Sequence, residues 1–168
     1  MLFRSNLVEA VDLALARALS EDERVIILGE DVGRNGGVFR ATVGLREKFG
    51  AKRVLDTPLA ETLIAGVAVG MSTQGLRPVA EIQFMGFIYA ALEHLISHAA
   101  RLRNRTRGRI SCPLTLRVPF GGGIHAPEHH SESTEALLTH IAGLKVVALS
   151  SPRTAYGLLL AAIRCNDP

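Results

Sequence analysis

Glu61 is a carboxylate at the start of an apolar helical segment, a setting that suggests chemistry. It lies in DTPLAETLIAGVAVG, residues 56–70, about one turn after Pro58. An acidic residue in a first helical turn complements the helix dipole, and Thr57-Pro58 is a helix-start signal. Apolar surroundings also suit a carboxyl group that shares a proton with a ligand. The residues themselves leave both interpretations open.

Three histidines and a glutamate follow a glycine-rich turn in GGGIHAPEHH, residues 121–130. The segment contains His-x-x-Glu-His, the inverted zinc-protease pattern, which works only on a helix where both histidines share one face. Pro127 lies inside the pattern and three glycines precede it, so we expect a loop and not a zinc-binding helix. Such a loop suits either solvated histidines or a site at the carboxyl end of a strand.

Two other polar stretches have ordinary structural explanations. GEDVG, residues 29–33, places Glu30 and Asp31 after an apolar run and is typical of a polar turn at a strand end. RLRNRTRGR, residues 101–109, is typical of a basic helix C-terminus, which the helix dipole favours. Nucleic-acid binding would favour a more basic domain with interleaved aromatic residues, so we expect no nucleic-acid partner.

Apolar runs alternate with helical periodicities along the chain. This alternation predicts an α/β fold, a parallel sheet with helices on both faces. We expect strands at 25–28, 53–55, 78–84, 114–118 and 144–149, and helices at 6–20, 43–49, 59–74, 87–106, 133–140 and 153–165. The chain stops where the alternation requires another strand, so we expect it to be the front part of a longer protein.

The composition indicates an ordinary globular domain. The 168 residues are 48% hydrophobic and 21% charged, and the net charge of +3 is too close to neutral to indicate a partner. Cys112 and Cys165 form no CxxC pair, so we expect a reduced, cytoplasmic compartment. No apolar run approaches the ~18 residues of a membrane span, and Arg4, Glu9 and Asp12 argue against a signal peptide.

Five segments together suggest a family: GEDVG, VFRATVGLREKFGAKRVLDTPLAE, AGVAVGMSTQGLRPVAEIQF, VPFGGGIHAPEHHSES and AGLKVVALSSP. In this order they resemble the beta subunit of the decarboxylating first component of 2-oxo acid dehydrogenase complexes, of the pyruvate and branched-chain types. The resemblance runs from about residue 5 to 168. It implies that residues 1–168 form a transketolase-like pyrimidine-binding domain, the thiamine diphosphate-binding fold, without the family's second, transketolase C-terminal-like domain.

The resemblance implies roles for five residues. Glu61 matches the glutamate that hydrogen-bonds a ring nitrogen of the thiamine diphosphate aminopyrimidine and favours its imino tautomer. Phe87 matches an aromatic residue that packs against the pyrimidine, with Gln83 nearby. His130 matches the active-site loop histidine implicated in passing the acyl group to lipoyl-lysine. Glu30 matches a carboxylate of an acidic chain between paired active sites.

The resemblance also implies metal ions and a partner chain. A potassium site in some relatives uses backbone carbonyls that match Leu114, Ala162, Cys165 and Asp167, although relatives often have Asp where Cys165 stands. Thiamine enzymes usually hold the diphosphate through magnesium with a GDG motif, and no GDG occurs here. In the family a separate alpha subunit supplies this magnesium site, so the chain is expected to be inactive alone.

The implied assembly contains two alpha and two beta chains and serves a lipoyl domain and a core acyltransferase. The implied reaction is oxidative decarboxylation of pyruvate or a branched-chain 2-oxo acid. Two alternatives stay open at this point. The same architecture acts on acetoin in acetoin dehydrogenase, and the chain alone could be a non-catalytic interaction module.

Overall fold

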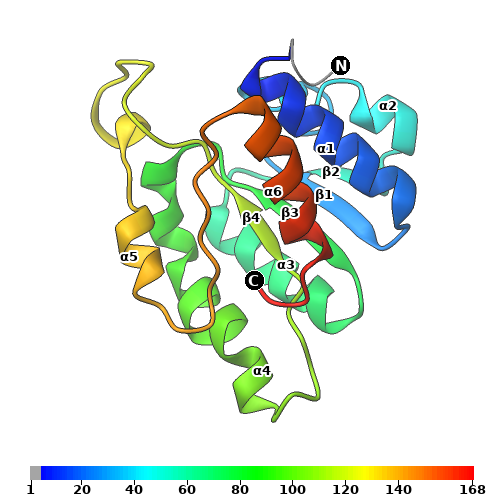
Figure 1. The fold of residues 1–168 in the computed structure, drawn as a ribbon, viewed down its shortest axis with the longest axis vertical. Helices are drawn as coiled ribbons and strands as arrows, with labels where there is room; N and C mark the ends of the chain where they lie inside the picture. The colour runs from blue at the N-terminus through cyan, green and yellow to red at the C-terminus, as the bar shows by residue number, and fades with distance from the viewer. Residues whose placement is uncertain (1–4) are drawn as a thin grey trace.

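Four short parallel strands form one sheet in the computed structural model, which describes residues 5–168 (Figure 1). Arg4 lies outside the described residues. The strands are β1 (Val25–Gly29), β2 (Val54–Asp56), β3 (Arg77–Glu81) and β4 (Thr115–Arg117), in the order β2-β1-β3-β4. Ile27 of β1 lies opposite Val54 on one side and Val79 on the other. All five residues of β1 are buried, as an inner strand of a parallel sheet requires.

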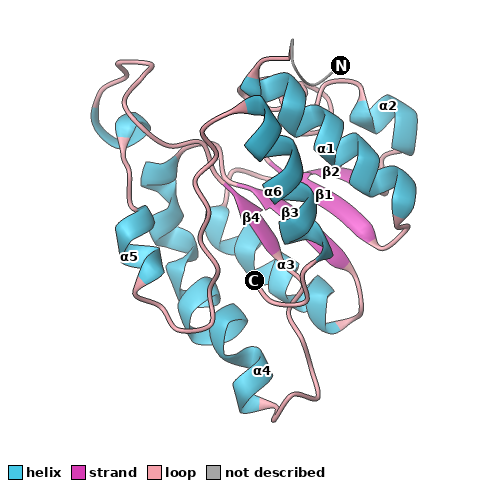
Figure 2. Cartoon of the chain, in the orientation of Figure 1, coloured by secondary structure: helices cyan, strands magenta, loops and turns pink. Residues whose placement is uncertain are grey.

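Helices cover both faces of this sheet (Figure 2). On one face α1 (Leu7–Glu21) packs against α6 (Pro152–Arg164), and α2 (Leu45–Phe49) joins the same core. On the other face α3 (Glu61–Thr73) packs against β3. Because neighbouring strand residues point to opposite faces, Ile27 joins the first core and Leu28 the second. The predicted α/β architecture is therefore confirmed.

The two helices of the first face have strong N-terminal signals. Asn6 caps α1 in a capping box with Glu9, and Ser151 caps α6 in a capping box with Thr154. Pro152 occupies the first turn of α6, where its missing N–H costs nothing. These caps explain why the predicted bounds of both helices agree closely with the structure.

The prediction of one continuous α-helix at 87–106 is wrong, because the segment is helical but irregular. The chain forms a 3₁₀ segment η2 (Met85–Ala91), a π turn η3 (His94–His98), a 3₁₀ turn η4 (Ala99–Arg101) and a short α4 (Leu102–Arg105). Side chains compete for its carbonyl groups: the oxygens of Ala90, Ile96 and Ser97 accept hydrogen bonds from Thr62, Arg101 and Arg105. These bonds weaken the α-helical pattern on which the prediction relied.

The predicted strand at 144–149 is also wrong. These residues pair with no strand of the sheet and run as an extended connection between α5 (Glu135–Thr139) and α6. Leu144 and Val146 pack against the second core, while Lys145 and Val147 are exposed. The amide of Lys145 donates to the carbonyl of Pro168, near the end of the chain (2.9 Å). The alternating hydrophobic pattern thus arises because one face of this extended segment packs against the core, although no strand of the sheet is hydrogen-bonded to it.

No helix among residues 5–168 is both long enough and apolar enough to cross a membrane.

Arg77 connects β3 to the C-terminal end of α6. Its Nη1 donates to the carbonyl oxygens of Ile163 (3.1 Å) and Cys165 (3.0 Å), and its Nη2 donates to Asn166 Oδ1 (2.7 Å). Its side chain is only 14% exposed and also lies 3.5 Å from a carboxylate oxygen of Asp22. The guanidinium therefore satisfies carbonyl groups that a helix end leaves without intrahelical partners.

We expect Arg77→Met to lower the free energy of unfolding by about 2–3 kcal/mol, since charge-assisted hydrogen bonds to half-buried carbonyls are lost. Urea denaturation followed by circular dichroism measures this change. Arg153→Met, at an exposed position of α6, is the matched control and should stay within about 0.5 kcal/mol of wild type. Equal stability of the two variants would contradict the role of Arg77.

Asp12 is a half-buried carboxyl group on the inner side of α1. Burial raises its pKa from 3.8 to about 6, against the opposing charges of Arg117 and Lys48. Its Oδ1 has no hydrogen-bond partner among the described residues. Between these two pH values the folded state holds more protons than the unfolded chain, so stability falls as the pH rises through this window.

Asp12→Asn should remove this pH dependence. Relative to wild type, we expect the variant to gain roughly 1 kcal/mol of stability between pH 4 and pH 7, because Asp12 is only half-buried and solvent screening reduces the effect of its raised pKa. Chemical denaturation at several pH values tests it, with Glu23→Gln as an exposed control. A constant difference between Asp12→Asn and wild type across this range would show that Asp12 does not cause it.

Candidate functional site

Glu61 is the first residue of α3, directly after the N-cap Ala60. The preceding turn is fixed by the amide of Thr57, which donates to the carbonyl of Gly29 at the end of β1 (3.0 Å). The side chain of Glu61 is half-buried, while Leu59 is 81% exposed and Leu63 is 43% exposed. The apolar residues beside Glu61 are therefore open at the surface of this chain and do not enclose the carboxylate.

Glu30 lies immediately after β1 and is buried, with 7% of its surface exposed. Burial raises the pKa of its carboxyl group, and the negative charges of Glu61 and Asp31 raise it further, while the amide of Ala60 lowers it by hydrogen bonding. Its Oε1 has no hydrogen-bond partner within the part of the chain that the structure describes. The fold thus brings Glu30 and Glu61 close enough to interact, and it holds a carboxyl group with a free, buried oxygen.

The segment that follows β3 lies against the start of α3. The Thr62 hydroxyl donates to the carbonyl of Ala90, at the end of η2 (2.7 Å). Phe87, in the middle of η2, is half-buried, and so is Gln83, just before it. The predicted residues Glu61, Phe87 and Gln83 therefore lie on two elements that are hydrogen-bonded to each other.

The histidine loop folds back onto η2. His130 belongs to the 3₁₀ turn η5 (Glu128–Ser131), and its ring is half-buried. Its ring centroid lies 4.7 Å from that of Phe84 and 5.3 Å from that of Phe87, both in edge-to-face geometry. The structure thus places His130 beside Phe87, on the segment that follows β3.

The backbone contact of His130 selects one nitrogen for chemistry. His130 Nδ1 lies 3.3 Å from the carbonyl oxygen of Pro127. Because a carbonyl oxygen can only accept, this contact favours a hydrogen on Nδ1 and leaves Nε2 as the nitrogen available to other groups. His129 is exposed and lies 3.9 Å from Glu132, so the two neighbouring histidines have different surroundings.

The loop character of the histidine segment is confirmed. His125 has a positive φ of 53°, Pro127 is extended, and η5 is a single turn. His125 and His129 therefore do not share a helical face, which the inverted zinc-protease pattern would require. Among residues 5–168 no cluster of three or more His, Cys, Asp and Glu side chains could hold a metal ion.

Gly86 allows the loop to approach η2 closely. A Cβ atom at this position would overlap the carbonyl oxygen of His129 and lie 2.7 Å from its Cβ. The Tyr89 hydroxyl also donates a short hydrogen bond to Glu132 Oε2, which raises the pKa of Tyr89. The sequence reasoning missed Gly86, Tyr89 and Glu132, because no local motif shows that residues 86 and 129 meet.

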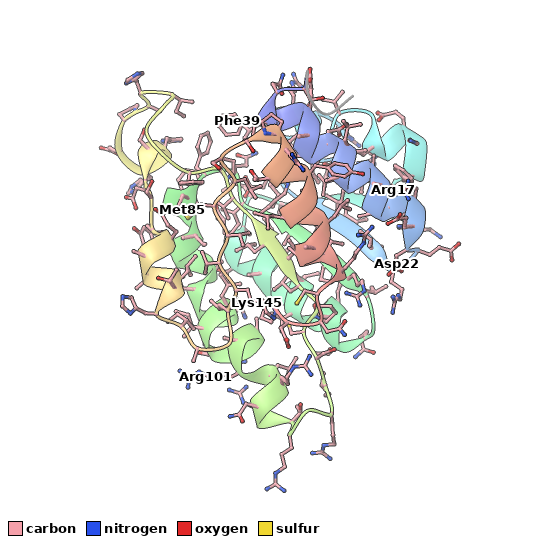
Figure 3. All side chains as sticks on the ribbon, viewed as in Figure 1. Arg17, Asp22, Phe39, Met85, Arg101 and Lys145 are labelled. Atoms are coloured by element: carbon pink, nitrogen blue, oxygen red, sulfur yellow. The ribbon has the colours of Figure 1, made fainter. Side chains whose placement is uncertain are left out.

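Glu81 and Arg117 form a buried ion pair below this region, at the carboxyl ends of β3 and β4. Glu81 is 2% exposed, and burial raises its pKa while the Arg117 guanidinium lowers it. Gly37, in the loop after β1, lies directly over the pair, since a Cβ there would be 3.2 Å from Glu81 Oε1. The pair thus supports the loop that carries Phe39, which Figure 3 labels at this end of the sheet.

The segments predicted to supply potassium ligands lie together. The amide of Cys112 donates to the carbonyl of Asn166 (3.2 Å), which brings Leu114 near the chain's last residues. The carbonyl of Ala162 already accepts from the amide of Cys165 (3.0 Å), and the carbonyl of Cys165 accepts from Arg77. Asp167 pairs through its side chain with Arg103 (2.5 Å) and Lys145 (3.2 Å), which leaves its carbonyl out of these contacts.

Comparison with known families identifies the family of this fold. Residues 5–168 match the family described as transketolase, pyrimidine binding domain. The chain belongs to this family. It is also similar to a solved chain described as "Split gene transketolase, inactive beta4 tetramer", at a TM-score of 0.77 and 19% identity. The matched region covers 97% of this chain and 49% of the solved chain. At this identity the likeness shows the shared fold.

Comparison with curated proteins identifies more specific relatives within this family. Over 163 residues it is 55% identical to the pyruvate dehydrogenase E1 component subunit beta of Acholeplasma laidlawii, covering 97% of this chain and 50% of that protein. It is 54% identical to the 3-methyl-2-oxobutanoate dehydrogenase subunit beta of Mycobacterium tuberculosis (97% and 47%). It is 51% identical to the 2-oxoisovalerate dehydrogenase subunit beta of Bacillus subtilis (96% and 49%). The resemblance found in the sequence is confirmed, and the chain spans about half the length of these relatives.

Gly86→Ala should displace the histidine loop from η2, because the added methyl group overlaps the backbone of His129. We expect faster amide hydrogen exchange across residues 128–131, by roughly tenfold or more, measured by mass spectrometry. Gly122→Ala is the matched control, since it lies in the same loop and its Cβ would meet no atom within 4 Å. Unchanged exchange in Gly86→Ala would show that the close approach does not hold the loop.

Proposed function

We propose that this chain is the pyrimidine-binding part of the beta subunit of a thiamine diphosphate-dependent 2-oxo acid dehydrogenase. The single observation that supports this most is a pair of contacts: the start of α3, which carries Glu61, is hydrogen-bonded to η2, which carries Phe87, and Phe87 packs against His130. The high identity to beta subunits named for pyruvate and branched-chain substrates supports the same reaction class. The nearly equal identities to both kinds leave pyruvate and branched-chain 2-oxo acids as substrates to be compared by experiment.

The residues present fit the pyrimidine half of the cofactor. A carboxylate at a helix start can hold a proton against a ring nitrogen, and a half-buried aromatic ring on the neighbouring segment gives the pyrimidine a packing surface. Glu30, with its unpartnered buried oxygen, can exchange a proton with groups near Glu61. When bound, thiamine diphosphate supplies the electron sink for loss of carbon dioxide from the 2-oxo acid.

In this proposal Glu61 holds the proton that selects the reactive tautomer of the pyrimidine, and Phe87 and Gln83 orient the ring. His130 presents Nε2 to the acyl acceptor, because Nδ1 is engaged by the Pro127 carbonyl. The acceptor is the lipoyl-lysine of a lipoyl domain attached to the core acyltransferase. The relatives' subunit names and the lack of a GDG motif support an alpha subunit that holds magnesium and the diphosphate.

The surface around Glu61 also supports a partner chain. Leu59 and Leu63, two residues before and after Glu61 in the chain, are exposed, and exposed large apolar side chains near a site favour burial by another protein. We therefore propose an assembly of two alpha and two beta chains, located in the cytoplasm. Potassium belongs to the proposal at the carbonyls of Leu114, Ala162, Cys165 and Asp167. Each carbonyl oxygen has two lone pairs, so the contact with Arg77 at Cys165 leaves one lone pair for a cation.

Reconstitution tests this proposal. The complete beta subunit should reduce an electron-accepting dye with a 2-oxo acid only when its alpha subunit and thiamine diphosphate are present. Pyruvate, a branched-chain 2-oxo acid and acetoin are compared side by side. Activity with acetoin alone would identify the acetoin enzyme, and failure of the complete beta subunit to bind an alpha subunit would favour a non-catalytic module.

Glu61→Gln tests the proton-sharing role within the reconstituted complex. We expect turnover to fall by ~100-fold or more, because an amide cannot hold the catalytic proton. Circular dichroism and assembly with the alpha subunit should be unchanged. Turnover near wild type would show that Glu61 only complements the helix dipole.

A further inference from the structure

Phe84 is an aromatic residue between β3 and η2, and its ring has three aromatic neighbours. Its centroid lies 4.7 Å from His130, 5.5 Å from Phe39 and 5.9 Å from Phe87, all in edge-to-face geometry. Of the two phenylalanine rings beside His130, Phe84 is the nearer. The chemistry proposed above uses Phe87 and His130 but gives Phe84 no role.

We propose that Phe84 is a positioning residue for His130, holding the imidazole so that Nε2 faces the acyl acceptor. The inference rests on the proposed function, since it takes His130 as the residue that serves acyl transfer. Phe84 itself touches neither the cofactor nor the acceptor in this proposal. It acts through the ring of His130.

Two contacts together fix the imidazole. The Pro127 carbonyl at 3.3 Å from Nδ1 determines which nitrogen is held by the backbone, and the Phe84 ring at 72° to the imidazole restricts rotation of the ring plane. An edge-to-face aromatic contact changes the population of one ring orientation by roughly 2- to 10-fold. Without Phe84 the ring would keep its tether at Nδ1 but lose the surface that sets its plane.

The ring of Phe84 is itself supported by a second aromatic ring. Phe39 lies at its other side, with an interplanar angle of 67°. The loop that carries Phe39 is fixed by the buried Thr42 hydroxyl, which donates to the Val32 carbonyl (2.8 Å), and by Gly37, which sits over the buried Glu81. Phe84 is therefore a ring in a supported stack and not a mobile surface side chain.

The step that needs this orientation transfers electrons and a proton together. The disulfide bond of the lipoyl group breaks and is reduced, while the carbon of the decarboxylated substrate is oxidised to an acyl group. One sulfur would form the new bond to the acyl carbon, which loses its hydroxyl proton and is released from the cofactor, the electron pair of that broken bond staying with the cofactor. The other sulfur takes a proton, which the doubly protonated imidazole of His130 can donate from Nε2. A proton donor acts over a hydrogen-bond distance, so the direction of Nε2 matters for this step in particular.

The test uses Phe84→Leu, Phe84→Tyr and the control Phe49→Leu in the complete beta subunit, reconstituted with its alpha subunit. Phe49 is a half-buried ring at the end of α2, packed against the first core. Carbethoxylation by diethyl pyrocarbonate, read by mass spectrometry, reports the accessibility of His130 against the exposed His125 in the same loop. Acyl transfer to a free lipoyl domain and 2-oxo acid-dependent dye reduction are measured separately.

In Phe84→Leu we expect a several-fold faster modification of His130, with His125 unchanged. The kcat of acyl transfer should fall by roughly 10-fold with little change in KM for the lipoyl domain, and dye reduction should stay within about twofold. Phe84→Tyr keeps the ring and should restore both readouts, and Phe49→Leu should match wild type. Wild-type modification and wild-type transfer in Phe84→Leu would overturn the proposal.

His130→Gln separates this proposal from the one it rests on. If His130→Gln loses acyl transfer while Phe84→Leu matches wild type, only the positioning role is wrong. If His130→Gln transfers acyl groups normally, the role of His130 is wrong and the positioning role is overturned with it. Should Phe84→Leu fail to assemble, Phe39→Leu tests the same stack one ring further back, and wild-type modification of His130 in that variant would equally overturn the inference.

Discussion

The parallel pairing of β1, β3 and β4 is the constraint on which the site depends. Parallel strands end at the same edge of a sheet, so the residues that follow them meet there. Glu30 follows β1, the segment with Phe84 and Phe87 follows β3, and the histidine loop follows β4. Residues up to a hundred positions apart in the chain are brought to one place by the register of a few strand residues, which the two buried cores fix.

Local sequence signals predicted the elements that have strong local causes. In α1, α6 and β1 the residue propensities, the hydrophobic pattern and the boundary signals all indicate the same element. The structure contains each of these three elements where the sequence predicts it. The strand expected at 144–149 failed for a different reason. An alternating pattern reports one buried face, which a packed extended segment also has, and only a free neighbouring strand edge can make it part of a sheet.

The candidate site shows the same division. Glu61 could be singled out from the sequence because it is a charged residue within an otherwise apolar helical segment. His130 was distinguished from His129 only through the family resemblance. The structure adds a physical difference, since the ring of His130 is half-buried and lies 4.7 Å from Phe84 and 5.3 Å from Phe87, whereas His129 is exposed and 6.4 Å from Phe87. Gly86, Tyr89 and Phe84 act through contacts with residues more than forty positions away. No window of the sequence contains such pairs.

The open surface around Glu61 gives a physical reason for dividing one active site between chains. A carboxylate that shares a proton with a ligand works best where water is excluded, yet a helix start covered by its own chain would leave no entry for a cofactor. Exposed Leu59 and Leu63 can exclude water only after another surface covers them. Under the proposed function, the proton-handling groups therefore become effective only upon assembly, and the diphosphate is anchored by the chain that closes the site. Assembly would then control activity without any conformational switch inside this domain, whose strand ends and aromatic contacts already hold Glu30, Phe87 and His130 in place.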